Sequence, residues 1–258
     1  MKIAVVGLGL IGGSIFKRLK REGYDVIGIS SSQQGDSIYS EYSFLADADV
    51  VFVAVPMKAT LKTLHKVAQY VTKETIVTEV SSVKNYLEGS AFSFKFIPSH
   101  PMAGTENFGF INSFPELFDG AKWVITPVED GIDTSVLELL IKRMGAIPVY
   151  MSIQEHDKAV ATISHLPMLI SQALFKQASN DESSLKLAAS GFRDMTRLAM
   201  SNVDMATDMI DLNSDNIQEA LLRLYSTIGD LLGNYTVENL ADIVDSRRNM
   251  YKDGKNIL

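Results

Sequence analysis

Four histidines, His65, His100, His156 and His165, are the side chains of this 258-residue sequence that could exchange a proton near neutral pH. His100 stands in PSHPMAGTE, just after the apolar run 96–97, so we expect it at the carboxyl end of a strand. In open α/β sheets, ligands bind at that edge. A base at this position could draw a proton from a substrate hydroxyl. The alternative is a capped strand end without catalysis.

Two serines in TEVSSVK, Ser81 and Ser82, end the preceding expected strand, so we expect them beside His100. A histidine and a hydroxyl next to a nicotinamide would suit removal of a proton from an alcohol while hydride leaves. His65 stands in a helical stretch without a polar cluster, and we expect it on the surface or in a structural role. The sequence has no cysteine, which excludes disulfides and thiolate chemistry, and we expect no metal.

The glycine-rich stretch GLGLIGGS, which begins at Gly7, matches the G-x-G-x-x-G pattern of dinucleotide-binding turns. A strand is expected before it and a helix after it. Gly7 would permit the sharp turn, Gly9 would let a pyrophosphate approach the backbone, and Gly12 would let the helix pack against the strand. A tight turn without a ligand is the alternative. The expected dinucleotide contacts are Gly7, Gly9, Leu10, Ile11, Gly12, Ser30, Ser31, Val55, Pro56 and Ser82.

The second expected strand ends in GISSSQQGD, with Ser30 where a site for NAD carries an acidic residue. The hydroxyls and amides of Ser31 and the residues after it can bond a phosphate, but no arginine stands beside them. The sequence therefore favours NADP only slightly over NAD, and an exposed serine loop is the alternative. The segment 31–49 is too short for the usual helix and third strand, so we expect a more open adenine side.

Apolar strands alternate with helices over the first part of the chain. This order predicts a parallel sheet covered on both faces, in an α/β fold of the Rossmann type. The expected strands are residues 2–6, 25–29, 46–56, 75–80, 95–97 and 122–126, and the expected helices are residues 14–22, 61–70 and 134–143.

The sequence changes character after Pro148. None of the seven prolines follows Pro167, and glycine becomes sparse. We therefore expect a dinucleotide-binding Rossmann domain over residues 1–150 and an all-α domain over residues 151–258. Apolar residues recur there at helical spacing, as in Ala220, Leu221, Leu224, Ile228, Leu231 and Leu232.

Composition excludes several classes of partner. The net charge is −7, and no run of lysine or arginine is long enough to follow a phosphate backbone, so we expect no nucleic acid partner. No stretch of about 18 apolar residues occurs, so we expect no membrane partner. The apolar beginning contains glycines and precedes KRLKRE, unlike a secretion signal. With the absence of cysteine, this favours a cytoplasmic protein.

Five motifs carry a resemblance to a known family. GLGLIGGS, TEVSSVK, SHPMAGTE, EHDKAVATISHLP and ASGFRDMTRLA follow one another in this order. Together they resemble the prephenate/arogenate dehydrogenase family of tyrosine biosynthesis, from Lys2 to about Ala199. The resemblance implies oxidation of a cyclohexadienol, prephenate or arogenate, by NAD(P) with loss of the ring carboxylate. It also implies a homodimer that pairs through the helical domain.

The resemblance assigns roles to three residues of this sequence. His100 matches the family's catalytic histidine, which draws the proton from the ring hydroxyl. Ser82 matches a serine that bonds the same hydroxyl against the nicotinamide. Arg197 matches an arginine that receives a substrate carboxylate, a task that suits the planar guanidinium.

Further residues of the resemblance border the site. Glu106 matches an acidic residue at its mouth, and Arg193 with Asp194 would form a buried supporting pair. His165 falls in a helix that lines the cleft, where a structural role is the alternative. Met168 departs from the family, because members that act on prephenate often carry a second histidine there. Methionine cannot bond the pyruvyl side chain, which favours arogenate.

Two alternatives stay open. One is another two-domain NAD(P) oxidoreductase of the β-hydroxyacid dehydrogenase or pyrroline-carboxylate reductase type, which shares the glycine-rich turn but would lack SHPMAG. The other is a nucleotide-sensing protein without catalysis. The joint presence of His100, Ser82 and Arg197 argues against the second.

Overall fold

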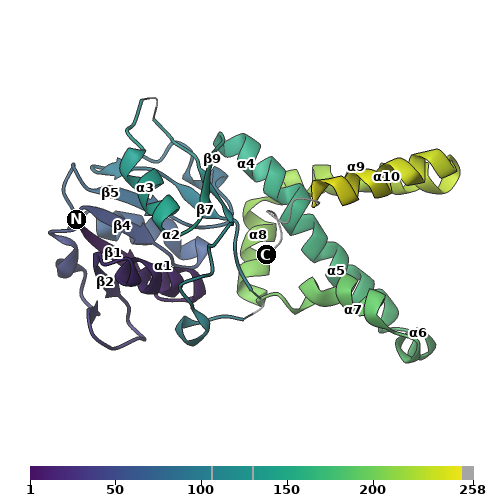
Figure 1. Ribbon diagram of the computed structural model, residues 1–258, viewed down its shortest axis with the longest axis horizontal. Helices are drawn as coiled ribbons and strands as arrows, with labels where there is room; N and C mark the ends of the chain where they lie inside the picture. Colours follow the sequence, from purple (N-terminus) through teal and green to yellow (C-terminus); the bar gives the residue numbers. More distant parts are fainter. Residues whose placement is uncertain (106, 130, 252–258) are drawn as a thin grey trace.

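The first part of the chain forms a six-stranded parallel sheet (Figure 1). The computed structural model describes residues 1–105, 107–129 and 131–251. The strand order is β3-β2-β1-β4-β5-β6, and every neighbouring pair is parallel. The strands are β1 (Lys2–Val6), β2 (Asp25–Ile29), β3 (Ile38–Tyr39), β4 (Val50–Val53), β5 (Ile76–Glu79) and β6 (Lys95–Phe96).

Both faces of this sheet are buried, which explains why its strands are apolar throughout. Side chains alternate along a strand, so Ile3 and Val5 face one side while Ala4 and Val6 face the other. The first side packs against α1 (Leu10–Arg21) and α3 (Ser135–Arg143), and the second against α2 (Met57–Val67). The predicted Rossmann-type α/β fold is confirmed.

A second, three-stranded sheet was not expected from the sequence. It contains β7 (Ser99–Pro101), β8 (Lys122–Ile125) and β9 (Ile147–Tyr150), with β7 antiparallel to β8. The prediction that residues 122–126 extend the parallel sheet is therefore wrong. His100 lies inside β7 and not at the end of a strand. Even so, the Ser99 hydroxyl lies 2.7 Å from that of Thr78 on β5. β7 therefore lies next to the carboxyl end of β5, near the sheet edge where His100 was expected.

The segment between β2 and β4 is short, as predicted, but it does contain a strand. β3 has two residues, and a single 3-10 turn, η1 (Tyr42–Leu45), replaces the usual helix. The prediction that no third strand fits was wrong in this detail. The turn brings Tyr42 beside the end of α2, where its ring lies under the Lys66 ammonium.

The chain becomes helical directly after β9. Ser152 and Glu155 form a capping box that begins α4 (Ile153–Val160). A π-helical turn, η4 (Ala161–His165), joins α4 to α5 (Leu166–Ala178). Pro167 has no backbone N–H and interrupts the regular helical hydrogen bonding at this point. The turn leaves His165 fully buried.

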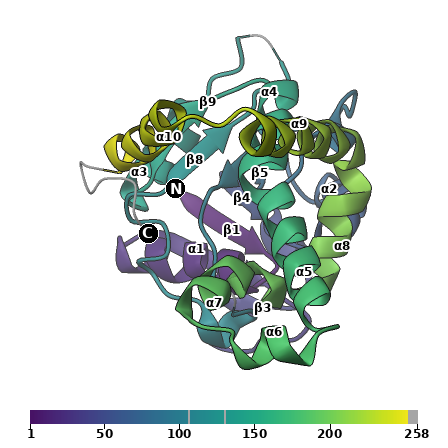
Figure 2. The same ribbon diagram turned by 90° about the vertical axis from the view of Figure 1, so that its right-hand side faces the viewer.

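Further helices complete the second region, which confirms the predicted all-α character (Figure 2). None of the helices in the described ranges is long and apolar enough to cross a membrane. These helices are α6 (Glu182–Lys186), α7 (Ser190–Thr196), α8 (Val203–Leu212), α9 (Ser214–Gly233) and α10 (Val237–Met250), and the short 3-10 turns are η2 (Asn85–Leu87), η3 (Phe110–Asn112) and η5 (Arg197–Met200).

Helices α9 and α10 extend from the body as an arm (Figure 1). The apolar series from Ala220 forms one helix, as its spacing predicted, but only Ala220 of that series is buried. Leu232 is 79% exposed, and Val237 on α10 is 76% exposed. Exposed apolar side chains in this number on two neighbouring helices are typical of a protein–protein contact.

Candidate active site

The glycine-rich turn connects β1 to α1, and each of its glycines meets a different steric condition. Gly7 has φ +91°, and a Cβ there would lie 2.5 Å from the Ala54 carbonyl oxygen. A Cβ on Gly12 would overlap the Gly7 carbonyl. A Cβ on Gly9, in contrast, would point into open space. Only glycine therefore fits the turn at two positions, while Gly9 leaves room for another molecule.

A cavity of about 540 Å³ opens beside this turn. Six of the expected cofactor contacts line it: Gly7, Gly9, Ser30, Ser31, Val55 and Pro56. Leu10 and Ile11 form the first turn of α1 instead, and no side chain caps that helix. Its free N–H groups and positive end suit a diphosphate, so the residues present fit a dinucleotide.

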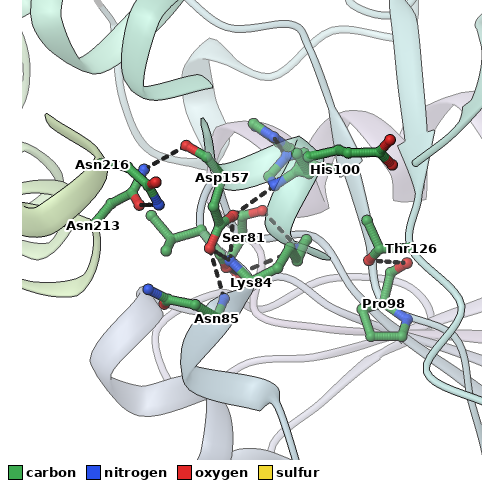
Figure 3. A network of polar contacts seen from close by, with 12 residues as sticks. Ser81, Lys84, Asn85, Pro98, His100, Thr126, Asp157, Asn213 and Asn216 are labelled. Atoms are coloured by element: carbon green, nitrogen blue, oxygen red, sulfur yellow. Dashed lines mark hydrogen bonds and ion pairs between the residues drawn. The ribbon is translucent and has the colours of Figure 1, made fainter. Parts of the chain in front are cut away.

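A chain of hydrogen bonds crosses from the helical region to His100 (Figure 3). His156 Nδ1 donates to Asp157 Oδ1 at 2.7 Å, because a carboxylate can only accept. His156 Nε2 lies 2.9 Å from His100 Nδ1. In neutral rings, His156 Nε2 then accepts from His100 Nδ1–H, and His100 Nε2 keeps its lone pair.

Asp157 is itself fixed by the N-terminal region. The Lys84 N–H donates to Oδ1 at 2.9 Å and the Asn85 N–H to Oδ2 at 2.7 Å. The carboxylate of Asp157, which belongs to the helical region, thus caps the 3-10 turn η2 of the N-terminal region. Since Asp157 is 1% exposed, solvent does not compete for these bonds.

A buried ion pair lies next to this chain. Lys84 and Glu79 are both fully buried, and their charged groups are in contact. Ser81 also belongs to this network, since its hydroxyl donates to Glu79 Oε2 at 2.5 Å and lies 2.8 Å from the hydroxyl of Tyr86. Ser81 therefore has a structural role.

Ser82 differs from its neighbour. It is partly exposed, and its hydroxyl makes no hydrogen bond with any residue that the structure describes. The structure thus leaves this hydroxyl free for a ligand. No hydrogen bond joins Ser82 to His100 in the described ranges.

The surroundings of His100 disfavour its protonated form. Burial, with the nearby His156, Lys84 and His165, holds the pKa of His100 well below its ordinary value. At neutral pH the imidazole is therefore uncharged and able to accept a proton.

His165 lies at the inner end of the same network. Asn213 Nδ2 lies 3.2 Å from His165 Nδ1 and donates to the Asp157 carbonyl at 2.8 Å. Burial lowers the pKa of His165 to about 4, so the ring is neutral. Its buried Nε2 has no partner among the described residues. A donor without a partner in a buried position is suited to a ligand.

The structure does not bring Arg197 to His100. Arg197 begins η5, is exposed, and lines a separate cavity of about 400 Å³ with Phe175 and Met200. Arg193 and Asp194 do pair, with Nε 3.4 Å from Oδ1, but their expected burial is wrong: their side chains are 79% and 72% exposed. The helix α7 that carries them packs on α5 and on η5.

The sequence also singled out Glu106 and Met168. Glu106 lies outside the described residues. Met168 is 4% exposed and packs with Met57 and Val83 of the N-terminal region and with Met209 of α8. It fills the apolar junction between the two regions, so its side chain offers no group to a substrate.

Sequence reasoning missed six residues of these networks: Glu79, Lys84, Tyr86, His156, Asp157 and Asn213. A signal existed for two of them, because the motif EHDKAV places His156 and Asp157 side by side on a helix. Their link to His100 depends on the docking of α4, which no local pattern specifies.

Comparison with known proteins identifies the family. Residues 17–148 match the family model described as prephenate dehydrogenase, nucleotide-binding domain. Residues 152–244 match that described as prephenate dehydrogenase, dimerization domain. The chain is 31% identical to prephenate dehydrogenase of Bacillus subtilis, over 98% of this chain and 75% of that protein.

Solved structures agree. Synechocystis arogenate dehydrogenase is 30% identical, with a TM-score of 0.81 and coverage of 98% of this chain and 99% of that one. Prephenate dehydrogenase from A. aeolicus, in complex with hydroxyphenyl propionate and NAD+, is 25% identical, with a TM-score of 0.84 and coverage of 97% and 98%.

The alternative classes share the fold alone. Pyrroline carboxylate reductase of Plasmodium falciparum is 12% identical with a TM-score of 0.51, and 3-hydroxyisobutyrate dehydrogenase of Mycobacterium tuberculosis is 14% identical with a TM-score of 0.52. The match of both family models and the 31% identity place the chain elsewhere. This chain belongs to the prephenate/arogenate dehydrogenase family of NAD(P)-dependent oxidoreductases.

Proposed function

We propose that this protein oxidises prephenate or arogenate in tyrosine biosynthesis, with His100 as the general base. A bound NAD(P) supplies the hydride acceptor, and loss of the ring carboxylate as carbon dioxide gives an aromatic product. The observation that carries the base assignment is the hydrogen-bonded chain from Asp157 through His156 to His100.

This chain fixes both the orientation and the tautomer of His100. Because its Nδ1–H donates to His156, the lone pair on Nε2 is available to the substrate hydroxyl. Proton transfer to Nε2 would create a positive charge. Lys84 already pairs with Glu79, so the Asp157 carboxylate supplies the negative charge that stabilises this imidazolium through His156.

Other residues would bind and orient the ligands. The turn at Gly7, Gly9 and Gly12 and the first amides of α1 would hold the diphosphate. The free hydroxyl of Ser82 would bond the hydroxyl that reacts. The unpartnered Nε2–H of neutral His165 would donate to the substrate.

A dimer would complete the substrate site. We propose that Arg197 binds a substrate carboxylate at the contact between two subunits, with Glu106 at the mouth. Support comes from the apolar side chains of the helical region that no described residue covers. The arm of α9 and α10 would pair with its copy, as the family's dimerization domain implies.

The proposal includes the division of the chain into two domains and its place in the cell. Residues 1–150 would form the dinucleotide-binding domain and residues 151–258 the substrate and dimerisation domain. The capping box at Ser152 supports this division, because it begins a helix directly after β9. The absence of cysteine favours the cytoplasm.

Kinetics with two substrates and two cofactors test the function. The rate of nicotinamide reduction should exceed background with prephenate or arogenate, and the four combinations decide which pair the enzyme prefers. Absence of turnover with all four, from protein that folds and dimerises, would contradict the proposal.

Replacement of the base gives the first prediction. His100→Asn should lower kcat by about 10²–10⁴-fold while the dissociation constant of the cofactor changes little. In the wild type, kcat/KM should stay level as pH falls through about 6.5 and decline only well below it, because the lowered pKa keeps His100 neutral. An acid limb at the ordinary histidine pKa would contradict the assignment.

A second prediction concerns the hydrogen bond between His156 and His100. His156→Phe removes the acceptor for His100 Nδ1–H, so kcat/KM should fall by up to about 100-fold. His156→Gln, whose amide oxygen can accept this bond, should recover part of the loss. Cofactor titrations serve as the control for folding. Equal rates in the two variants would show that the bond has no role.

A third prediction concerns Gly9 and Gly12 of the glycine-rich turn. Gly9→Ala should weaken cofactor binding about tenfold while Tm stays within a degree or so, because its Cβ meets only the space for the diphosphate. Gly12→Ala should lose cofactor binding and also about 1–3 kcal/mol of stability, since its Cβ overlaps the Gly7 carbonyl. Normal affinity in Gly9→Ala would place the diphosphate elsewhere.

A fourth prediction concerns the proposed contact of Arg197 with a substrate carboxylate. Arg197→Ala should raise the substrate KM by at least about tenfold and leave cofactor affinity within about twofold, since a charged hydrogen bond is lost. Lys186→Ala, which removes an exposed cation that pairs with Glu182 on α6, is the matched control. A similar loss of affinity for substrate and cofactor would point to misfolding instead.

A further inference from the structure

A lysine that sequence reasoning did not assign lies at the adenosine end of the nucleotide cavity. Lys66 stands in the last turn of α2, and its ammonium lies 3.8 Å from the centroid of the Tyr42 ring. Both residues line the cavity, together with Ser30, Ser31, Ser32, Gln33 and Ser40. A residue far along the chain thus places a positive charge opposite the end of β2.

The short segment after β2 creates this arrangement. With a 3-10 turn in place of a helix, Tyr42 packs beside the end of α2, and its ring also lies 6.1 Å from that of Tyr70. A cation over an aromatic face is attracted to it, so Tyr42 holds the Lys66 side chain over the cavity. An exposed lysine without this ring would sample many rotamers.

The charge of the cavity favours an additional anion. No Asp or Glu is among the described residues that line it, and Lys66 is its one cationic lining residue there. Ser30 stands where a carboxylate would repel a phosphate, and its hydroxyl accepts from the Gln33 N–H at 3.1 Å. This bond folds residues 30–33 into a turn, which directs further hydroxyls to the same end of the cavity.

We propose that Lys66, with the serines of residues 30–32 and Ser40, forms a subsite for the 2′-phosphate of NADP. The enzyme consequently prefers NADP to NAD. The ammonium acts as a point charge for the phosphate, and the serine hydroxyls donate to its oxygens. This inference rests on the proposed function in one respect, that the cavity binds the cofactor.

Binding of two adenosine fragments tests the subsite without turnover. Isothermal titration of the full chain compares adenosine 2′,5′-bisphosphate with 5′-AMP, which lacks only the 2′-phosphate. The wild type should bind the bisphosphate about tenfold or more tightly. Lys66→Ala should remove most of this difference and leave the affinity for 5′-AMP within about twofold, while Lys66→Arg should retain it.

Lys62 provides a matched control, because it is exposed on the same helix and does not line the cavity. Lys62→Ala should keep the preference for the bisphosphate, which separates a placed cation from a general positive field. The ratio of kcat/KM for NADP to that for NAD should fall about tenfold in Lys66→Ala alone.

Each failure has its own meaning. Equal binding of the two fragments by the wild type, or an equal loss of both in Lys66→Ala, would overturn the subsite while the cofactor site stands. Failure of the wild type to bind either fragment would overturn the cofactor site and the subsite together.

Discussion

One carboxylate holds the two parts of this molecule in register. Asp157, at the start of the helical region, accepts hydrogen bonds from two backbone N–H groups of the N-terminal region and from His156. Through His156 the same carboxylate reaches His100 (Figure 3). The orientation of the base is therefore a property of the docked molecule, and neither region could set it alone.

The neighbourhood of this carboxylate is costly to build. Glu79 and Lys84 form a fully buried ion pair, and burial lowers the pKa of Lys84 even though Glu79 opposes the shift. Loss of one partner in such a pair leaves an uncompensated buried charge, which costs about 3–5 kcal/mol. The pair also fixes Ser81, so the backbone that leads to Ser82 is rigid. The stability of this region depends on the same groups that shape the site.

The sequence was informative wherever a local pattern decides the structure. Apolar runs predicted β1, β2, β4 and β5, and the steric roles of Gly7 and Gly12 follow from the turn itself. Contacts between segments far apart in the sequence could not be predicted from local patterns. β7 has three residues and is a strand only because β8 pairs with it, and Lys66 reaches the cavity only because Tyr42 packs against α2.

Burial was the least predictable property. The helical spacing from Ala220 correctly gave α9, but a spacing cannot tell whether an apolar face packs within its own chain or against another. The same reasoning explains Arg193 and Asp194, which a motif suggested as a buried pair and which lie exposed on this single chain. Met168 is the opposite case: the motif suggested that it faces the substrate, but it is buried in the apolar junction between the two regions.

The tautomer of His100 tests the central claim most directly. With only four histidines in the chain, long-range proton–nitrogen NMR correlations can resolve each imidazole. The bridge from Asp157 predicts a proton on Nδ1 of residue 100 and an unprotonated Nε2, unchanged as pH falls through about 6.5. A proton on Nε2, or titration near pH 6.5 like that of a free imidazole, would contradict it.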